Sequence, residues 1–156
     1  MRFGKPPKAG KSRKTRPTLN IPPFAKISPA SDHPVNRGWK EFTLHDEPYI
    51  NNYFGKDGNR LAPNVTALAV SLLPPEAPER ETVAWCVERP DGGRGFGIVM
   101  PHFHQNWTHE DLRRFIPNGI VWSAKLDVPA EGVRAETPDL AAFKPGSLTP
   151  QPFVKP

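Results

Sequence analysis

The sequence predicts an α/β domain between two proline-rich ends. Three apolar runs, at residues 65–73, 82–88 and 94–100, have the length and composition typical of β-strands. Residues 108–126 follow them with apolar side chains at helical spacing, which predicts one amphipathic helix. Prolines are densest at the two ends of the 156-residue chain, so we expect the domain to span residues 32–128.

The first 31 residues form a basic segment. They contain eight Lys or Arg and no Asp or Glu, while the whole chain carries a formal net charge of +5, so the rest carries about −3. Charge of one sign with few large apolar residues predicts disorder in residues 1–31. Residues 129–156 are likewise expected to form an extended tail. The basic segment has only two aromatic residues, which favours a solvated tail over a nucleic-acid binder.

Local signals define the elements within the domain. Residues 91–93, Asp-Gly-Gly, supply positive φ angles and predict an antiparallel hairpin over residues 82–100. A short strand is expected at residues 42–44, in a segment that Pro and Gly punctuate. Two apolar runs without alternation, ALAV and GIVM, predict strands that are covered on both faces.

The expected helix has a clear N-terminal signal and contains a proline near its middle. Thr108 is the expected N-cap, and two acidic residues follow it in the first turn. Pro117 removes one helical hydrogen bond, which predicts a kink or two separate segments.

Cysteine content and hydropathy bound the class of protein. A single cysteine, Cys86, allows neither an intramolecular disulfide nor a four-cysteine zinc site, and its apolar neighbours predict burial. No run reaches the roughly 18 apolar residues of a membrane span. The basic N-terminus is not followed by the apolar segment of a signal peptide, so we expect a cytoplasmic chain without a membrane partner.

Two histidines directly after the third strand are the first candidate site residues. The stretch GFGIVMPHFHQNW places His102 and His104 two residues apart, where extended backbone would put both on one face. Asn106 adds an amide, and Trp107 adds a ring on which a sugar or base can stack. Half-buried loop histidines bonded to the backbone are the alternative.

The consecutive residues His45, Asp46 and Glu47 form a second ionisable cluster. If this loop meets the two histidines, imidazole and carboxylate groups face each other as an acid–base pair or as ligands of a divalent metal. A solvated surface turn is the alternative. We expect an imidazole nitrogen of His102 or His104 to lie within about 8 Å of a polar side-chain atom of this cluster.

Residues 81–133, ETVAWCVERPDGGRGFGIVMPHFHQNWTHEDLRRFIPNGIVWSAKLDVPAEGV, resemble the C-terminal half of a ThuA-like (trehalose-utilisation) domain. That family ends on a pattern of the type ERPxGGRxFG…HFHxNW. The segment DHPVNRGWKEFTLHDEPYIN resembles the family's stretch up to its DE-(W/F)-Y motif, which brings Tyr49 into the candidate site. The resemblance covers about residues 32–128.

The resemblance implies a class I glutamine amidotransferase-like, flavodoxin-type α/β fold, of which this chain would hold only part. Amidotransferases carry a His-x-Glu after the corresponding strand, whereas this chain has His-Phe-His at residues 102–104. No cysteine lies at a strand-to-helix turn, which argues against glutamine hydrolysis. Residues 100–101 are Met-Pro where relatives more often have Gly-Gly.

The functional hypothesis that follows is a ThuA-like domain fragment linked to the binding or metabolism of a small saccharide. Its candidate catalytic residues are His102, His104 and Glu47, and its candidate binding residues are His45, Asp46, Tyr49, Asn106 and Trp107. A catalytically silent interaction or scaffold domain is the alternative. The few expected strands leave sheet edges unpaired, which predicts poor independent folding and self-association.

Overall fold

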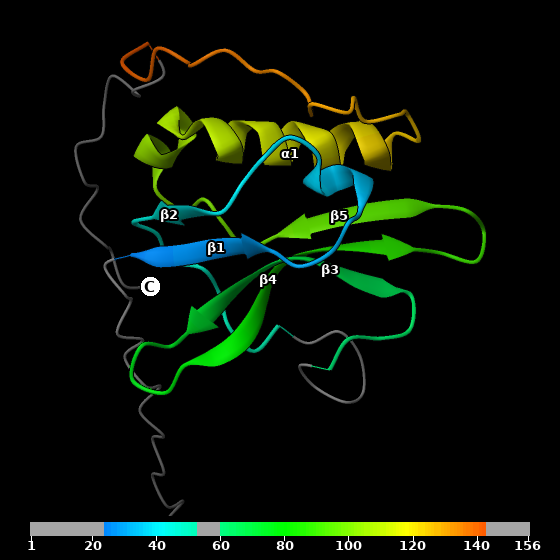
Figure 1. The fold of residues 1–156 in the computed structure, drawn as a ribbon, viewed down its shortest axis with the longest axis horizontal. Coiled ribbons are helices and arrows are strands. Elements are labelled where there is room, and N and C mark those ends of the chain that lie inside the picture. Colours follow the sequence, from blue (N-terminus) through cyan, green and yellow to red (C-terminus); the bar gives the residue numbers. More distant parts are fainter. Residues whose placement is uncertain (1–23, 53–59, 143–156) are drawn as a thin grey trace, which may run out of the picture.

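The computed structural model describes residues 24–52 and 60–142, which form one antiparallel sheet and one layer of helix (Figure 1). The sheet runs in the order β2-β1-β3-β4-β5. Its strands are β1 (Ala25–Pro29), β2 (Phe42–Leu44), β3 (Val65–Leu73), β4 (Glu79–Glu88) and β5 (Arg94–Ile98). The helices are α1 (Glu110–Ser123) and two 3-10 turns, η1 (Pro34–Asn36) and η2 (His104–Thr108).

The mixed α and β composition is confirmed, and so are four of its elements. Strands were expected at residues 65–73 and 42–44, and β3 and β2 occupy them. The expected hairpin is formed by β4 and β5, paired from Ala84↔Ile98 to Glu88↔Arg94. Every pairing between described strands is antiparallel, whereas a flavodoxin-type sheet is parallel.

The tail boundary at residue 31 is wrong. Strand β1 pairs with β2 on one side and with β3 on the other. Ala25 and Ile27 are buried while Lys26 between them is exposed, which is the alternation of a half-buried strand. Residues 1–23 and 143–156, on which the rest of the two tail predictions falls, lie outside the described residues. The described part of the C-terminal segment runs along the outer side of α1 as an extended chain (Figure 1).

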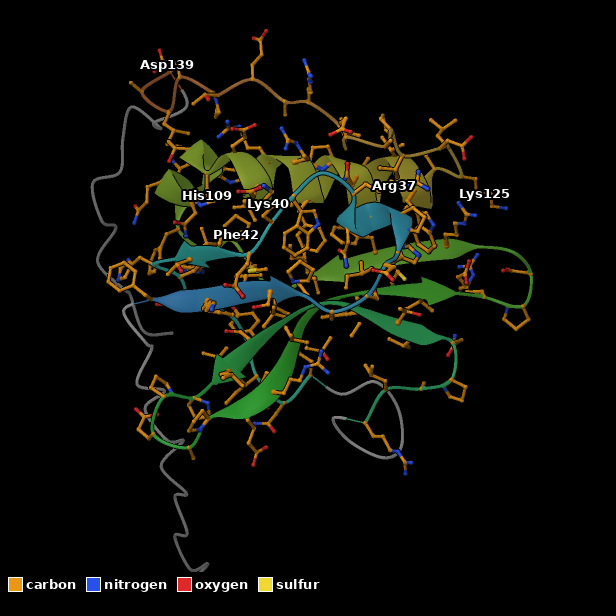
Figure 2. The ribbon with its side chains drawn as sticks, viewed as in Figure 1. Arg37, Lys40, Phe42, His109, Lys125 and Asp139 are labelled. Atoms are coloured by element: carbon orange, nitrogen blue, oxygen red, sulfur yellow. The ribbon has the colours of Figure 1, made fainter. Side chains whose placement is uncertain are left out.

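The core lies between α1 and one face of the sheet (Figure 1). Leu112, Phe115 and Trp122 of α1 are buried against it. At the start of the helix, the rings of Phe42 and His109 are 4.8 Å apart (Figure 2). Cys86 is buried in this cluster, as its apolar neighbours predict.

The helix begins one residue later than expected and does not break. His109 is its N-cap, while Thr108 ends η2 and its hydroxyl donates to the carbonyl of Gln105 at 2.8 Å. Pro117 lies inside a continuous α1, so the expectation of two segments is wrong. Burial of one apolar stripe outweighs the hydrogen bond that the proline removes, which costs about 3 kcal/mol in an exposed helix. No helix within residues 24–52 and 60–142 has the length and apolar character to span a bilayer.

His33 precedes η1 and lies partly buried. Its Nδ1 accepts a hydrogen bond from the backbone N–H of Val35 at 3.3 Å, and its ring packs edge-on against Trp122 at 4.8 Å. Burial is the largest influence on this imidazole and lowers its pKa from 6.5. The folded state therefore binds fewer protons at His33 than the unfolded state does.

This difference predicts a pH dependence of stability. The contribution of His33 is fully present above pH 6.5 and is lost as the pH falls toward the lowered pKa of the folded state. In urea unfolding between pH 7.5 and 5, His33→Asn, which keeps a capping side chain, should reduce the loss of stability on acidification. The exposed His104→Asn is the matched control, and an equal reduction in both variants would contradict the assignment to His33.

Candidate functional site

Two loops that follow β2 and β5 meet at one edge of the fold. The Nε2 atom of His102 lies 3.9 Å from Oε2 of Glu47. The expected approach of the two clusters to within about 8 Å is therefore confirmed. The Met100–Pro101 peptide that leads into the second loop is cis.

Asp46 holds the two loops together. Its Oδ1 accepts hydrogen bonds from the backbone N–H groups of Glu47 at 2.8 Å, His102 at 2.7 Å and Phe103 at 3.4 Å. The residue is 0% exposed, so the expectation that Asp46 binds substrate directly is not met. A carboxylate that accepts several N–H bonds fixes the backbone around it. Asp46 thereby fixes the backbone of Glu47 and His102.

Asn106 makes a second link between the same loops. Its Nδ2 donates to the carbonyl of His45 at 2.8 Å, and its side chain is buried. The expectation that Asn106 contacts a ligand is likewise not met, because its amide is engaged with the backbone. Asn106 and Asp46 are thus buried residues that hold the two loops of the candidate site in place.

Four rings form a continuous chain of contacts at this edge, which we call the aromatic row: Phe24, His45, Phe103 and His102. Phe24 meets His45 edge-on at 5.8 Å, and His45 stacks on Phe103 at 5.3 Å with 11° between the ring planes. The ring of His102 follows at 5.1 Å from Phe103. Phe24 is 65% exposed and His45 is exposed, so the row presents ring surface to solvent.

The ion pair at the end of the row is open to solvent. The side chains of His102 and Glu47 are 53% and 30% exposed, so the pair contributes little to stability and both groups remain accessible. An imidazole beside a carboxylate can donate and accept hydrogen bonds to hydroxyl groups, and it can move a proton near neutral pH. The pair is therefore the chemically versatile part of this edge.

Three expected site residues stand apart from the pair. His104 begins η2, so the extended backbone that would align it with His102 has already ended. Trp107 lies within the same turn, and its carbonyl accepts from Nη1 of Arg113 at 2.9 Å. Tyr49 is exposed. None of the three has a ring contact or ion pair with the aromatic row or Glu47 in the described part of the chain.

Metal ligation finds little support at this edge. Within residues 24–52 and 60–142, no group of three or more His, Cys, Asp or Glu side chains is arranged to hold an ion. The close pair at this edge consists of one imidazole, His102, and one carboxylate, Glu47, which is fewer than the three protein ligands of a typical zinc site.

Two members of the aromatic row were not among the expected site residues. Phe103 lies between His102 and His104 in sequence, and this position could have identified it as a site residue. Phe24 was assigned to the basic tail, since nothing in the surrounding prolines and lysines indicates a strand. Both rings depend on contacts between distant segments.

Comparison with known proteins gives no information about the family or function of the chain. No family model, curated protein or solved structure matches the chain. The residues of the site and the resemblance in sequence are therefore the basis on which a function can be proposed.

Proposed function

We propose that this chain is part of a ThuA-like domain and binds a small saccharide on the aromatic row. The resemblance of residues 81–133 to the end of that family supports the assignment. The observation that carries the binding proposal is the exposed aromatic row with the His102–Glu47 pair at its end.

The chemistry of the row matches that of a sugar. A pyranose has an apolar face of C–H groups that packs on aromatic rings, and a rim of hydroxyls that needs polar partners. The stacked rings of His45 and Phe103 supply the surface, while His102 Nε2 and the Glu47 carboxylate supply a donor and an acceptor. A proton passing between these two groups is the simplest catalytic role consistent with the proposal.

The parent fold in this proposal is a flavodoxin-type, glutamine amidotransferase-like domain. Its support is the sequence pattern, because the described strands pair antiparallel. A parallel sheet would require strands beyond the five described here, and residues 25–128 would form one side of such a domain.

Saccharide binding can be measured by NMR titration of the full chain with trehalose and with glucose. Phe103→Leu keeps an apolar side chain but removes the stacking surface, so we expect the affinity to fall about tenfold, or about 1.4 kcal/mol. Tyr49→Leu removes an exposed ring outside the row and should leave the affinity within about twofold.

The outcome also separates the alternative functions. Equal losses in the Phe103 and Tyr49 variants would contradict binding on the row. If neither sugar changes the NMR spectrum, the scaffold alternative is favoured. Salt-dependent binding to generic DNA that requires residues 1–23 would favour the nucleic-acid alternative.

A further inference from the structure

Strand β5 is an edge of the sheet with one side open to further pairing. Its strand neighbour within residues 24–52 and 60–142 is β4 alone. None of its five residues is buried, whereas Ala84 and Cys86 of β4, which pair with it, are 0% and 2% exposed. The strand has no proline and no register shift, and its one charged residue, Arg94, is at its start. It therefore lacks most of the features by which edge strands avoid further pairing.

The other edge strand, β2, is shorter and better covered. It has three residues, and side chains from the chain that follows β5 are bonded close to both of its ends. Asp111 accepts from the backbone N–H of Lys40 at 3.0 Å, and Asn106 donates to the carbonyl of His45 at 2.8 Å. Strand β5 is thus the edge to which a further strand can add.

The pairing with β4 determines which backbone groups β5 offers. Two hydrogen bonds mark the ends of this pairing: Arg89 N–H to the Gly93 carbonyl and Val99 N–H to the Val83 carbonyl. In an antiparallel ladder the bonded residues alternate, so the odd-numbered residues of β5 bond to β4. Arg94, Phe96 and Ile98 consequently direct their N–H and C=O groups away from β4.

The flank of α1 beside β5 is apolar and exposed. Gly119 lies so close to the Phe96 ring that no side chain fits between them, and Ile120 follows it with 61% of its surface exposed. On the other flank, Asn118 donates to the carbonyl of Val35 in η1. Because successive helical residues are about 100° apart, Ile120 lies about 160° around the helix from Asn118. Ile120 is therefore on the flank of β5 and not on that of η1.

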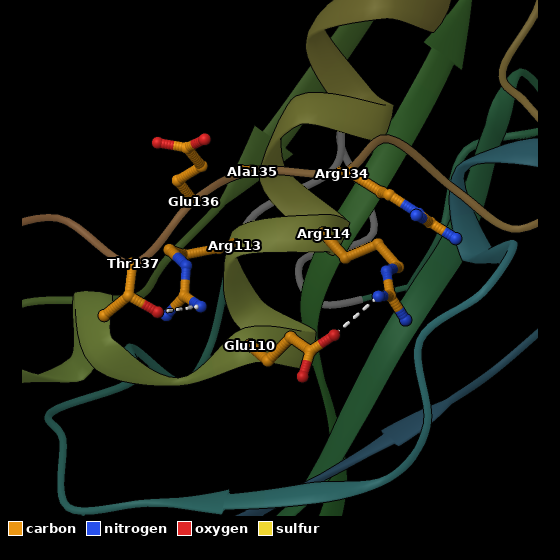
Figure 3. Close-up of a pocket in the computed structure, with 7 residues that line it drawn as sticks. All are labelled: Glu110, Arg113, Arg114, Arg134, Ala135, Glu136 and Thr137. Atoms are coloured by element: carbon orange, nitrogen blue, oxygen red, sulfur yellow. Dashed lines mark hydrogen bonds and ion pairs between the residues drawn. The ribbon is translucent and has the colours of Figure 1, made fainter.

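Other parts of the helix surface are covered by this chain itself. Residues 134–137 run over the first turns of α1, where the Thr137 hydroxyl accepts from Nη2 of Arg113 at 2.9 Å (Figure 3). Ile120 is the one large apolar side chain of α1 that is exposed. The open edge of β5 and this side chain together form one surface without a partner in the described part of the chain.

We propose that two copies of this chain associate through β5 as a symmetric antiparallel pair. The edge is complementary to itself about Phe96, since Phe96 then faces the partner's Phe96 and Arg94 faces the partner's Ile98. This register forms about six backbone hydrogen bonds between the copies and places no two like charges opposite each other. The self-association expected from unpaired edges is thereby assigned to one strand.

The helix flank favours a second copy over an unrelated strand. A two-fold axis through an antiparallel pair is perpendicular to the sheet, so both α1 helices lie on the same face of the joined sheet. Their Ile120 flanks then face each other and are removed from water, which an unrelated strand would not achieve. The pair is closed because β2 is covered, so we expect a dimer and not a filament. No residue of the aromatic row takes part, which makes the inference independent of saccharide binding.

Sedimentation velocity of the full chain over about 5–500 µM tests the proposal, because a short edge pairing gives roughly micromolar affinity. We expect the mass to rise with concentration from 17.4 kDa to twice that value. Ile120→Lys makes two like charges face each other and should weaken the association at least about tenfold. Leu72→Lys makes the same change of charge at an exposed residue of β3 and should alter it by less than about twofold.

Hydrogen exchange locates the interface without any substitution. The Phe96 amide should exchange at least about tenfold more slowly at high than at low concentration, whereas the Gly97 amide, bonded to β4, should be protected at both. A monomer at every concentration would overturn the proposal, and so would assemblies larger than a dimer. Equal effects of the two lysine variants, or exchange at Phe96 that does not depend on concentration, would also overturn it.

Discussion

Asn118→Ala is expected to destabilise the domain by about 4 kcal/mol, measured by urea or thermal unfolding. Asn118 is fully buried in α1 and joins three segments. Its Nδ2 donates to the carbonyls of Val35 at 3.0 Å and Arg37 at 2.8 Å, and its Oδ1 accepts from the N–H of Val133 at 2.7 Å. Alanine would remove these partners from the Arg37 carbonyl and the Val133 N–H, and it would leave the Val35 carbonyl with only the longer bond from Trp39 Nε1 at 3.3 Å. Each buried group left unsatisfied costs about 1–3 kcal/mol.

Asn118→Asp is an informative second variant, because the asparagine and aspartate side chains have almost the same volume. The carboxylate can still accept from Val133, but it faces two carbonyl oxygens where the amide donated. We therefore expect a loss comparable to that of the alanine variant. A change below about 1 kcal/mol in both variants would show that the backbone groups find other partners, and that the amide is not the link between α1 and its neighbours.

The elements that the sequence predicted are those defined by local patterns. The β4–β5 hairpin follows from two apolar runs around an Asp-Gly-Gly turn, and α1 follows from one helical stripe. The alternative of two segments at Pro117 was wrong because propensity is local, whereas the stripe is stabilised by the sheet beneath it. The alternation in strand β1 is too short to predict a strand, since β1 has only five residues and its hydrogen bonds come from distant strands.

The same difference between local patterns and contacts of distant segments applies to the candidate site. The approach of His102 to Glu47 was predicted from two clusters of ionisable residues that each follow an expected strand, although β2 and β5 are the two outer strands of the sheet. Phe24 could not be predicted, because its place depends on the register that pairs Ala25 with Leu44. That register brings the residue before β1 beside the residue after β2, and hence Phe24 beside His45. Burial of Asp46 likewise depends on N–H groups from a loop 56 residues away in sequence.

Asp46→Ala is expected to cost about 3 kcal/mol and to abolish saccharide binding on the aromatic row. Two short charge-assisted bonds, from the N–H groups of Glu47 and His102, are lost together with a longer one from Phe103. Each such bond contributes about 1.5–3 kcal/mol, and part of this is recovered if water reaches the exposed N–H groups. Without this acceptor the spacing of His102 and Glu47 depends on the Asn106 bond and the ring contacts alone, so unfolding and trehalose titration should both report the change.

Asp46→Asn separates the hydrogen bonds from the charge. Its side-chain oxygen can accept from the same three N–H groups, but as a neutral acceptor it forms weaker bonds, so we expect a loss of about 1 kcal/mol with binding retained. A ¹H–¹⁵N spectrum should then show the Phe103 amide near its original position in the asparagine variant and displaced in the alanine variant. If alanine leaves that amide unshifted, Asp46 does not hold the two loops together, and the aromatic row is assembled by the ring contacts and Asn106.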